Sequence, residues 1–202
     1  MSAPEPRTIL AGHLRPGHHG PAERTGATLR ERRAALLELS ARRGRAGDVA
    51  AFLREAAGLD LPPPGRAISG AEAAALWIAP ATVLLVGAAA ALEPVRARVP
   101  REIATALDQS FGYAILRLAG AAARAVLAKG CRVDLDPGAF APGQVARTIV
   151  AQVPTILHQA DAAPTFELIV PASLARSFAD FLIEAAAEFG CAVEPAIGRD
   201  PG

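Results

Sequence analysis

The chain has 202 residues and a mass of 20.7 kDa, with 51% hydrophobic but only 4% aromatic residues. This length allows one large domain or two small ones around a closely packed, alanine-rich core. The net charge of +1 gives no overall attraction to nucleic acid or membrane, and the two cysteines provide neither a disulfide framework nor a metal-binding spacing. The cysteine usage and an N-terminus without a secretory signal favour a cytoplasmic location.

Residues 1–28 are predicted to form an extended basic arm. They hold four prolines, four glycines and three histidines, and residues 1–45 carry nine arginines against four glutamates. We expect such an arm to lack a core of its own and to become ordered against a larger acidic partner. Without interleaved aromatic residues, a nucleic-acid-binding tail is not favoured. His13, His18 and His19 have no cysteine or acid at ligand spacing, which favours a solvated arm over a zinc site.

Residues 29–202 are predicted to form an α+β body of two related halves, about 29–100 and 101–192. In the first half, residues 34–41 indicate a strand, with a turn of helix as the alternative. Asp48 is the expected N-cap of a helix that ends before Gly58 in the left-handed C′ position. A stiff Pro-Pro-Pro-Gly turn at 62–65 follows.

Ala73–Leu92 is a run of twenty residues without a charge, long enough to suggest a membrane span. Pro80 interrupts it, however, and separates two short apolar stretches at 76–78 and 83–86. This pattern predicts a buried β-hairpin and not a membrane helix.

The second half repeats this order of elements. A strand over 111–119 is followed by a short alanine-rich helix between Gly120 and Gly130. Strands are predicted over 145–158 and 166–170, with Pro154 and Pro164 as breakers, and then a last helix with Ser173 as N-cap and Gly190 at its end. At an offset of 74 residues, 49–61 aligns with 123–135 without gaps, including Asp60 with Asp134. We interpret this as a tandem βαββ duplication.

Few residues have the context that chemistry needs. Cys131 follows Lys129-Gly130 and could be an activated thiol, but a lysine, a C′ glycine and a small buried residue also describe an ordinary helix end, which we favour. Asp134 and Asp136 are better explained as turn acceptors beside Pro137 than as a metal site, because the ligands are too few.

The remaining candidates are weaker still. His158 at the end of a strand is expected to be hydrogen-bonded or exposed. None of the serines considered lies in a Gly-x-Ser-x-Gly elbow, and neither a dinucleotide loop nor a phosphate loop occurs. We therefore predict no catalytic, cofactor-binding or metal-binding residue on this chain. The serines are Ser40, Ser69, Ser110, Ser173 and Ser177.

Two stretches carry a resemblance to a known family: LAKGCRVDLDPGAFAPGQ at 127–144 and PTFELIVPASLARSFADFL at 164–182. With them, the body from Leu29 to Phe189 resembles the gamma subunit of heterotetrameric sarcosine oxidase, a small relative of the aminomethyltransferase (glycine-cleavage) fold. In the YgfZ-like relatives of this fold, Lys-Gly-Cys continues to Gly-Gln-Glu. Arg132-Val133-Asp134 stands here instead, so that function is not transferred.

The resemblance implies a structural subunit in an oxidase that demethylates sarcosine to glycine, with hydrogen peroxide and formaldehyde or methylenetetrahydrofolate as the other products. It implies alpha, beta and delta partners, with most contact to alpha, and places FAD, FMN, NAD, tetrahydrofolate and zinc on those subunits. The alternative is a free-standing folate-binding protein of the same fold, for which Asp134 or Glu167 could anchor the pterin.

Overall fold

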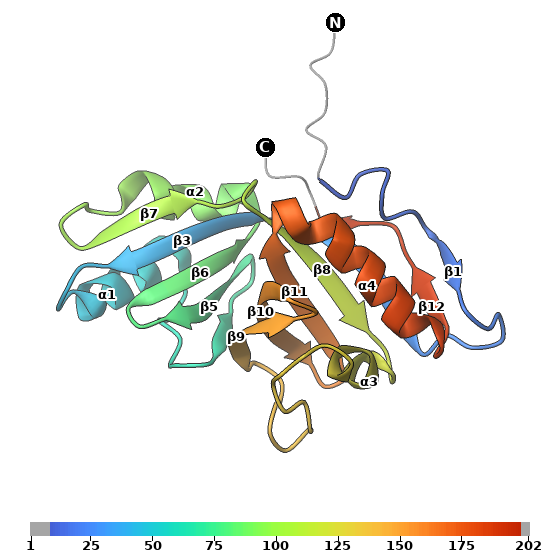
Figure 1. Cartoon of the computed structure of the whole chain (residues 1–202). Helices are drawn as coiled ribbons and strands as arrows, with labels where there is room; N and C mark the ends of the chain where they lie inside the picture. Colours follow the sequence, from blue (N-terminus) through green and yellow to red (C-terminus); the bar gives the residue numbers. More distant parts are fainter. Residues whose placement is uncertain (1–8, 199–202) are drawn as a thin grey trace, which may run out of the picture.

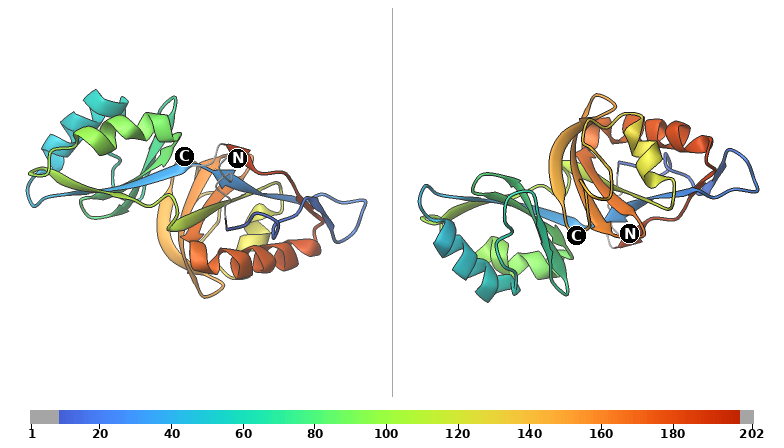
Figure 2. Two further views of the ribbon diagram at one scale, coloured as in Figure 1. Left: turned by 90° about the horizontal axis from the view of Figure 1, so that it is seen from above. Right: turned by 90° about the horizontal axis from the view of Figure 1, so that it is seen from below.

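The computed structural model describes residues 9–198, which form two twisted β-sheets lying side by side (Figure 1). Each sheet carries helices on one face only. Seen from above and below, the helices of one sheet lie on the opposite side of the molecule from those of the other (Figure 2). The fold is mixed α+β, as the sequence predicts.

The five-stranded sheet has the order β4-β5-β6-β3-β7. It is covered by α1 (Ala46–Ala57) and α2 (Ala89–Arg98), which pack against each other and bury Val49, Leu53, Leu92 and Val95. Its strands are β3 (Ala35–Ala41), β4 (Ala67–Ser69), β5 (Ala73–Ala79), β6 (Thr82–Gly87) and β7 (Ala104–Asp108).

The eight-stranded sheet has the order β1-β12-β2-β8-β11-β10-β9, and β13 also pairs with β2. It is covered by α3 (Ala123–Ala128) and α4 (Ala175–Ala187), which follows a 3-10 turn at Ala172–Leu174. Its strands are β1 (Gly17–His19), β2 (Ala27–Arg33), β8 (Tyr113–Ala119), β9 (Val145–Val150), β10 (Val153–Asp161), β11 (Thr165–Pro171), β12 (Cys191–Val193) and β13 (Ile197–Gly198).

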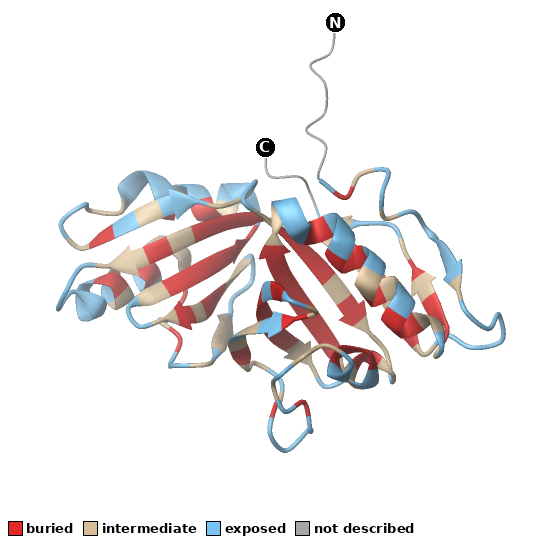
Figure 3. Ribbon diagram, viewed as in Figure 1, coloured by how far each residue is buried: buried red, intermediate tan, exposed pale blue. Residues whose placement is uncertain are grey.

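A third apolar cluster lies between the sheets. Alternate residues along β3 serve different cores: Leu37 and Leu39 face α1 and α2, whereas Leu36 packs with Ile115, Ile156 and Ile169 of the other sheet. Because both faces of these central strands are covered, buried residues dominate them (Figure 3). The shared cluster joins the sheets into one body.

The five-stranded sheet is one contiguous segment, β3 to β7, which lies in the chain between strands β2 and β8 of the eight-stranded sheet. β2 precedes β3 in the chain, yet it pairs with β8 and β12 in the eight-stranded sheet. At its other end, β7 lies beyond residue 100 and still pairs with β3 in the five-stranded sheet. The boundaries of the sheets therefore differ from those of the predicted halves at 29–100 and 101–192; the tandem duplication itself stays a prediction.

Most predicted elements are present, with differences at their ends. Gly58 has φ +63° and closes α1 as expected, but α1 begins at Ala46, so Asp48 lies in its first turn and not at its N-cap. Ser173 lies in the 3-10 turn and makes no capping hydrogen bond. The segment predicted as one strand at 145–158 is a hairpin of β9 and the first part of β10. Its turn is at Ala151 and Gln152, and Pro154, the predicted breaker, lies within β10. The uncharged run Ala73–Leu92 contains the β5–β6 hairpin, followed by the start of α2.

The described part of the predicted arm, residues 9–28, packs on its own chain. Leu10 is 1% exposed within the core beneath α4, and β1 pairs with β12. Arg176 of α4 donates to the carbonyl of Ile9 at 3.0 Å. An added Cβ at Gly20, which has φ +93°, would overlap the backbone of Ala187. The sequence predicted docking on a partner and not on this chain, because Ile9, Leu10 and Leu14 are the few large apolar residues among turn formers.

Candidate functional site

A row of polar residues crosses the eight-stranded sheet on the face that also meets the five-stranded sheet. The strand register aligns Arg30 of β2 with Arg117 of β8, Arg117 with Glu167 of β11, and Glu167 with His158 of β10. Two residues along the same strands, Ile115, Ile169 and Ile156 belong to the cluster between the sheets. The period-two alternation of strands thus places a charged row next to an apolar one.

Glu167 is the centre of this polar row. Its side chain is 2% exposed, and its two carboxylate oxygens accept hydrogen bonds from the Nη1 of Arg32 at 2.5 and 2.6 Å. The Nη1 of Arg117 lies 3.8 Å from Oε1, and the Nδ1 of His158 lies 3.5 Å from Oε2. Arg117 also approaches Asp161 at 3.8 Å, and Arg30 pairs with Glu194. Side chains from β2, β8 and β10 therefore converge on the Glu167 carboxylate of β11.

Two opposing influences set the pKa of Glu167. Burial, the largest single influence, disfavours the charged carboxylate, but the neighbouring imidazole of His158 and the guanidinium of Arg32 together outweigh it. The pKa of Glu167 therefore lies below its usual value. At 3.5 Å the His158 contact is long for a hydrogen bond, so we assign the tighter hold to Arg32.

This arrangement is suited to holding strands together. Glu167 is ionised, covered and already paired, so it cannot accept a proton from a substrate without breaking those contacts. His158 is 5% exposed, so the exposed alternative expected from sequence is wrong, and its Nδ1 is buried without a hydrogen bond among the described residues. The polar row could not be predicted from the sequence, because its members meet only through pairing between distant strands.

The segment at 131–144, which carries much of the family resemblance, is contacted at two backbone carbonyls by one arginine. Arg124 of α3 donates to the carbonyl of Leu135, to the carbonyl of Phe140 at 3.1 Å and to the Oε1 of Gln159 at 3.1 Å. Its guanidinium also lies 5.4 Å from the centroid of the Phe166 ring. Sequence reasoning missed Arg124, although an arginine on the helix just before a long loop is the available signal.

Lys129 and Cys131 do not form a reactive pair. The Nζ of Lys129 donates to the carbonyl of Ala185, pairs with Glu188 and lies 5.1 Å from the Phe189 ring centroid, so it links α3 to the end of α4. Burial raises the pKa of the Cys131 thiol, the opposite of what a nucleophile needs.

The other predicted candidates lie apart from one another. Asp134 accepts the backbone N–H of Asp136 at 3.0 Å, the turn role expected of it. His13 contacts Asp180 at 2.9 Å, and His18 contacts the carbonyl of Arg24 at 2.8 Å. Within residues 9–198, no group of three histidine, cysteine or acidic side chains is arranged to hold a metal.

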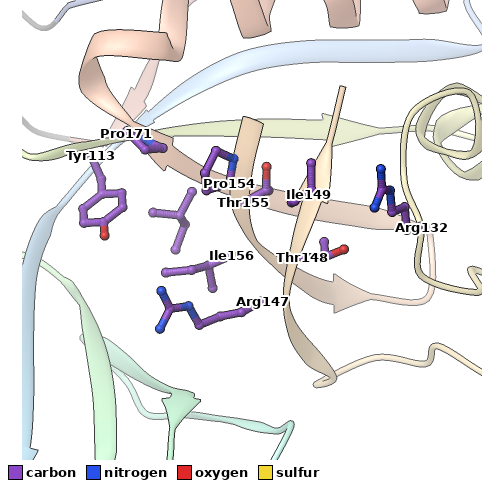
Figure 4. A pocket seen from close by; sticks show the side chains of 10 residues that line it. Tyr113, Arg132, Arg147, Thr148, Ile149, Pro154, Thr155, Ile156 and Pro171 are labelled. Carbon is purple, nitrogen blue, oxygen red and sulfur yellow. The ribbon is translucent and has the colours of Figure 1, made fainter. Parts of the chain in front are cut away.

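An open pocket of about 410 Å³ lies beside β9 (Figure 4). Its apolar wall is formed by Ile156 and Ile169, together with Tyr113 and two prolines, and Arg132 and Arg147 lie at its sides. No acidic side chain lines it.

Comparison with known proteins places this architecture in a family. The family model described as "Sarcosine oxidase, gamma subunit family" matches residues 43–188. The chain belongs to the sarcosine oxidase gamma subunit family. The gamma subunit from Corynebacterium sp. strain U-96 is 31% identical over 146 residues, covering 70% of this chain and 71% of that one. The gamma subunit from strain P-1 is 34% identical over 144 residues, covering 69% and 70%.

Solved structures agree with the family assignment. A chain of the heterotetrameric sarcosine oxidase from Corynebacterium sp. U-96, in complex with pyrrole 2-carboxylate, superposes with a TM-score of 0.78 at 29% identity, covering 91% of this chain and 96% of that one. Aminomethyltransferase T of the glycine cleavage system from Bartonella henselae gives a TM-score of 0.61 at 18% identity, covering 93% and 50%. The gamma-family chain thus shares the aminomethyltransferase fold. Among the helices of the described residues, none is long and apolar enough to cross a membrane.

Proposed function

We propose that this chain is the non-catalytic, structural gamma subunit of a heterotetrameric sarcosine oxidase. The observation that supports this most is the superposition over nearly the whole length of a chain in such an oxidase. The arrangement of charged side chains supports it as well, because Glu167, Lys129 and Arg124 each hold one element of the fold to another.

The complete enzyme, in this proposal, oxidatively demethylates sarcosine to glycine, with hydrogen peroxide and formaldehyde or methylenetetrahydrofolate. The partners are alpha, beta and delta subunits, with most of the contact to alpha. The complex is located in the cytoplasm. FAD, FMN, NAD, tetrahydrofolate and zinc are assigned to the other chains.

Three observations within residues 9–198 speak against a folate site on this chain. Of the two acids that could anchor a pterin, Glu167 is 2% exposed and bound by Arg32, and Asp134 lies exposed on a loop and accepts a backbone N–H of its own turn. The pocket beside β9 has two arginines and no acid. These observations favour the structural subunit over a free-standing folate-binding protein.

Purification from the native host with a tag on this chain tests the proposal. We expect flavin-containing subunits to co-purify, and sarcosine-dependent peroxide formation to require them. Recovery of the chain as a solitary, active monomer would contradict the proposal. Titration of the isolated chain with tetrahydrofolate is the companion measurement, and binding at about micromolar Kd would favour the folate-binding alternative.

A further inference from the structure

β9 is the outer strand of the eight-stranded sheet, with β10 on its inner side only. Its two ends are covered: Val145 donates its N–H to the carbonyl of Gly65, and Val150 forms a bridge with Cys131. Between them, residues 146–149 have no second strand among the described residues. An uncovered strand edge is a ready template for another extended chain.

The pairing pattern fixes which backbone groups face outward. The N–H of Val145 points away from β10, so by the alternation of antiparallel strands those of Arg147 and Ile149 do as well. The partner of Ile149 is Pro154, which has no N–H to give, as expected opposite an outward-facing residue. Within residues 9–198, no other segment accepts the outward N–H groups of Arg147 and Ile149.

The side chains around this edge combine charge and apolar surface. Arg132 and Arg147 are exposed, and within residues 9–198 neither guanidinium has a hydrogen bond or an ion pair. Ile149 is 39% exposed on the strand itself. The adjoining pocket of about 410 Å³ has an apolar wall in which one medium-sized side chain can be buried.

We propose that an extended acidic segment of a partner subunit adds to the sheet along β9. In this arrangement, its backbone pairs with residues 146–149, separate aspartate or glutamate side chains pair with Arg132 and with Arg147, and an apolar side chain enters the pocket. The inference rests on the proposed subunit function and adds the surface and the chemistry of the partner. Charge complementarity selects the occupant, since two unpaired arginines and no acid line the site.

The test uses the complete complex with variants of this chain. Arg147→Glu and Arg132→Glu each reverse an unpaired charge at the pocket, and Arg43→Glu is the matched control, an exposed arginine in the loop after β3. We expect the two pocket variants to lower the yield of co-purified partner by about tenfold or more, and the control to match wild type. Circular dichroism and thermal melting verify that each variant is folded.

Hydrogen exchange gives an independent measurement. The amides of Arg147 and Ile149 should exchange at least about tenfold more slowly in the complex than in the isolated chain, because pairing protects them. Wild-type assembly of both pocket variants, or unchanged exchange at these amides in the intact complex, would overturn the docking site while leaving the subunit function standing. Normal assembly together with acetate or phosphate binding by the isolated chain would assign the pocket to a small anion and also overturn it. Failure of the wild-type chain to co-purify with any partner would instead refute the subunit function.

Discussion

Glu167 shows how one buried charge can connect several strands. Its carboxylate is covered by the sheet and accepts hydrogen bonds from Arg32, while His158 and Arg117 lie next to it. Removing one member of a buried ion pair leaves its partners without compensation, which costs more than the pair itself contributes. The polar row is therefore expected to be sensitive to single substitutions.

Glu167→Gln should lower the free energy of unfolding by about 3 kcal/mol, at the low end for a buried pair because Arg32 retains partial access to solvent. Glu184→Gln, an exposed position on α4, is the control and should change stability by less than about 0.5 kcal/mol. Urea unfolding of both variants measures the difference. Equal stabilities of the two would mean that the polar row does not hold the strands.

The pH dependence of stability follows from the same carboxylate. Since the pKa of Glu167 is lower in the folded chain than its usual value, its contribution is fully present above a pH of about 4.3 and is lost as the pH falls through the folded-state pKa. Wild type should therefore lose stability on acidification more steeply than Glu167→Gln. Parallel unfolding curves from pH 7 down to about pH 3 would contradict this assignment.

Cys131→Ala should leave sarcosine turnover of the assembled oxidase unchanged, because burial raises the pKa of the thiol and Lys129 is engaged elsewhere. Cys191→Ala, at the other buried thiol, is the matched control. A loss of about a hundredfold in turnover for Cys131→Ala alone, typical of removing a catalytic group, would show that the thiol takes part in the reaction.

At the scale of elements, Arg124 orders the long segment between α3 and β9. Arg124→Ala removes charged hydrogen bonds to the carbonyls of Leu135 and Phe140 and should cost about 2 kcal/mol, with Arg43→Ala as the exposed control. Hydrogen exchange over 133–141 should accelerate in the first variant only. Unaltered exchange there would mean that local turns suffice to hold the segment.

The sequence predicted elements well where local chemistry decides them. Gly58 ends α1 because only a residue tolerant of positive φ closes a helix in that way, and Pro164 lies in the turn before β11. The hairpin at Ala151 and Gln152 was not predictable, because both have positive φ without the asparagine or glycine that normally marks such a turn. Pro154 is the nearest residue of a type that normally interrupts a strand, so the sequence predicts the break there.

On the scale of the whole molecule, what escaped prediction is pairing over long sequence distances. The pairing of β2 with β8 and β12 leaves no local trace in the sequence, and neither does the polar row to which β2 contributes Arg30. The family resemblance predicted the type of fold because it compares residues along the whole body, from Leu29 to Phe189, and not one local segment. The absence of site residues on this chain stays a prediction.

The docking of residues 9–28 changes what a truncation should do. An arm without a core of its own, as predicted for residues 1–28, could be removed with the body still folded, but Leu10 is buried in the core and Ala27 and Thr28 belong to β2. Leu10→Ala should lower stability by about 2–4 kcal/mol, as for other buried leucines, with the neighbouring, 39% exposed Ile9→Ala as control. Thermal unfolding measures both variants. Equal melting temperatures would show that Leu10 does not stabilise the body and that residues 9–28 behave as an arm.

The position of β2 in the eight-stranded sheet also affects how the chain folds during synthesis. β2 leaves the ribosome early, but its neighbours β8 and β12 are translated only at 113–119 and 191–193. Until β12 emerges, one edge of β2 has no neighbour, so the eight-stranded sheet cannot be completed early in translation, whereas the strands of the five-stranded sheet all lie within residues 35–108. Contacts this far apart in sequence slow folding, and we expect the eight-stranded sheet to reach its final form only after release, later than the five-stranded one.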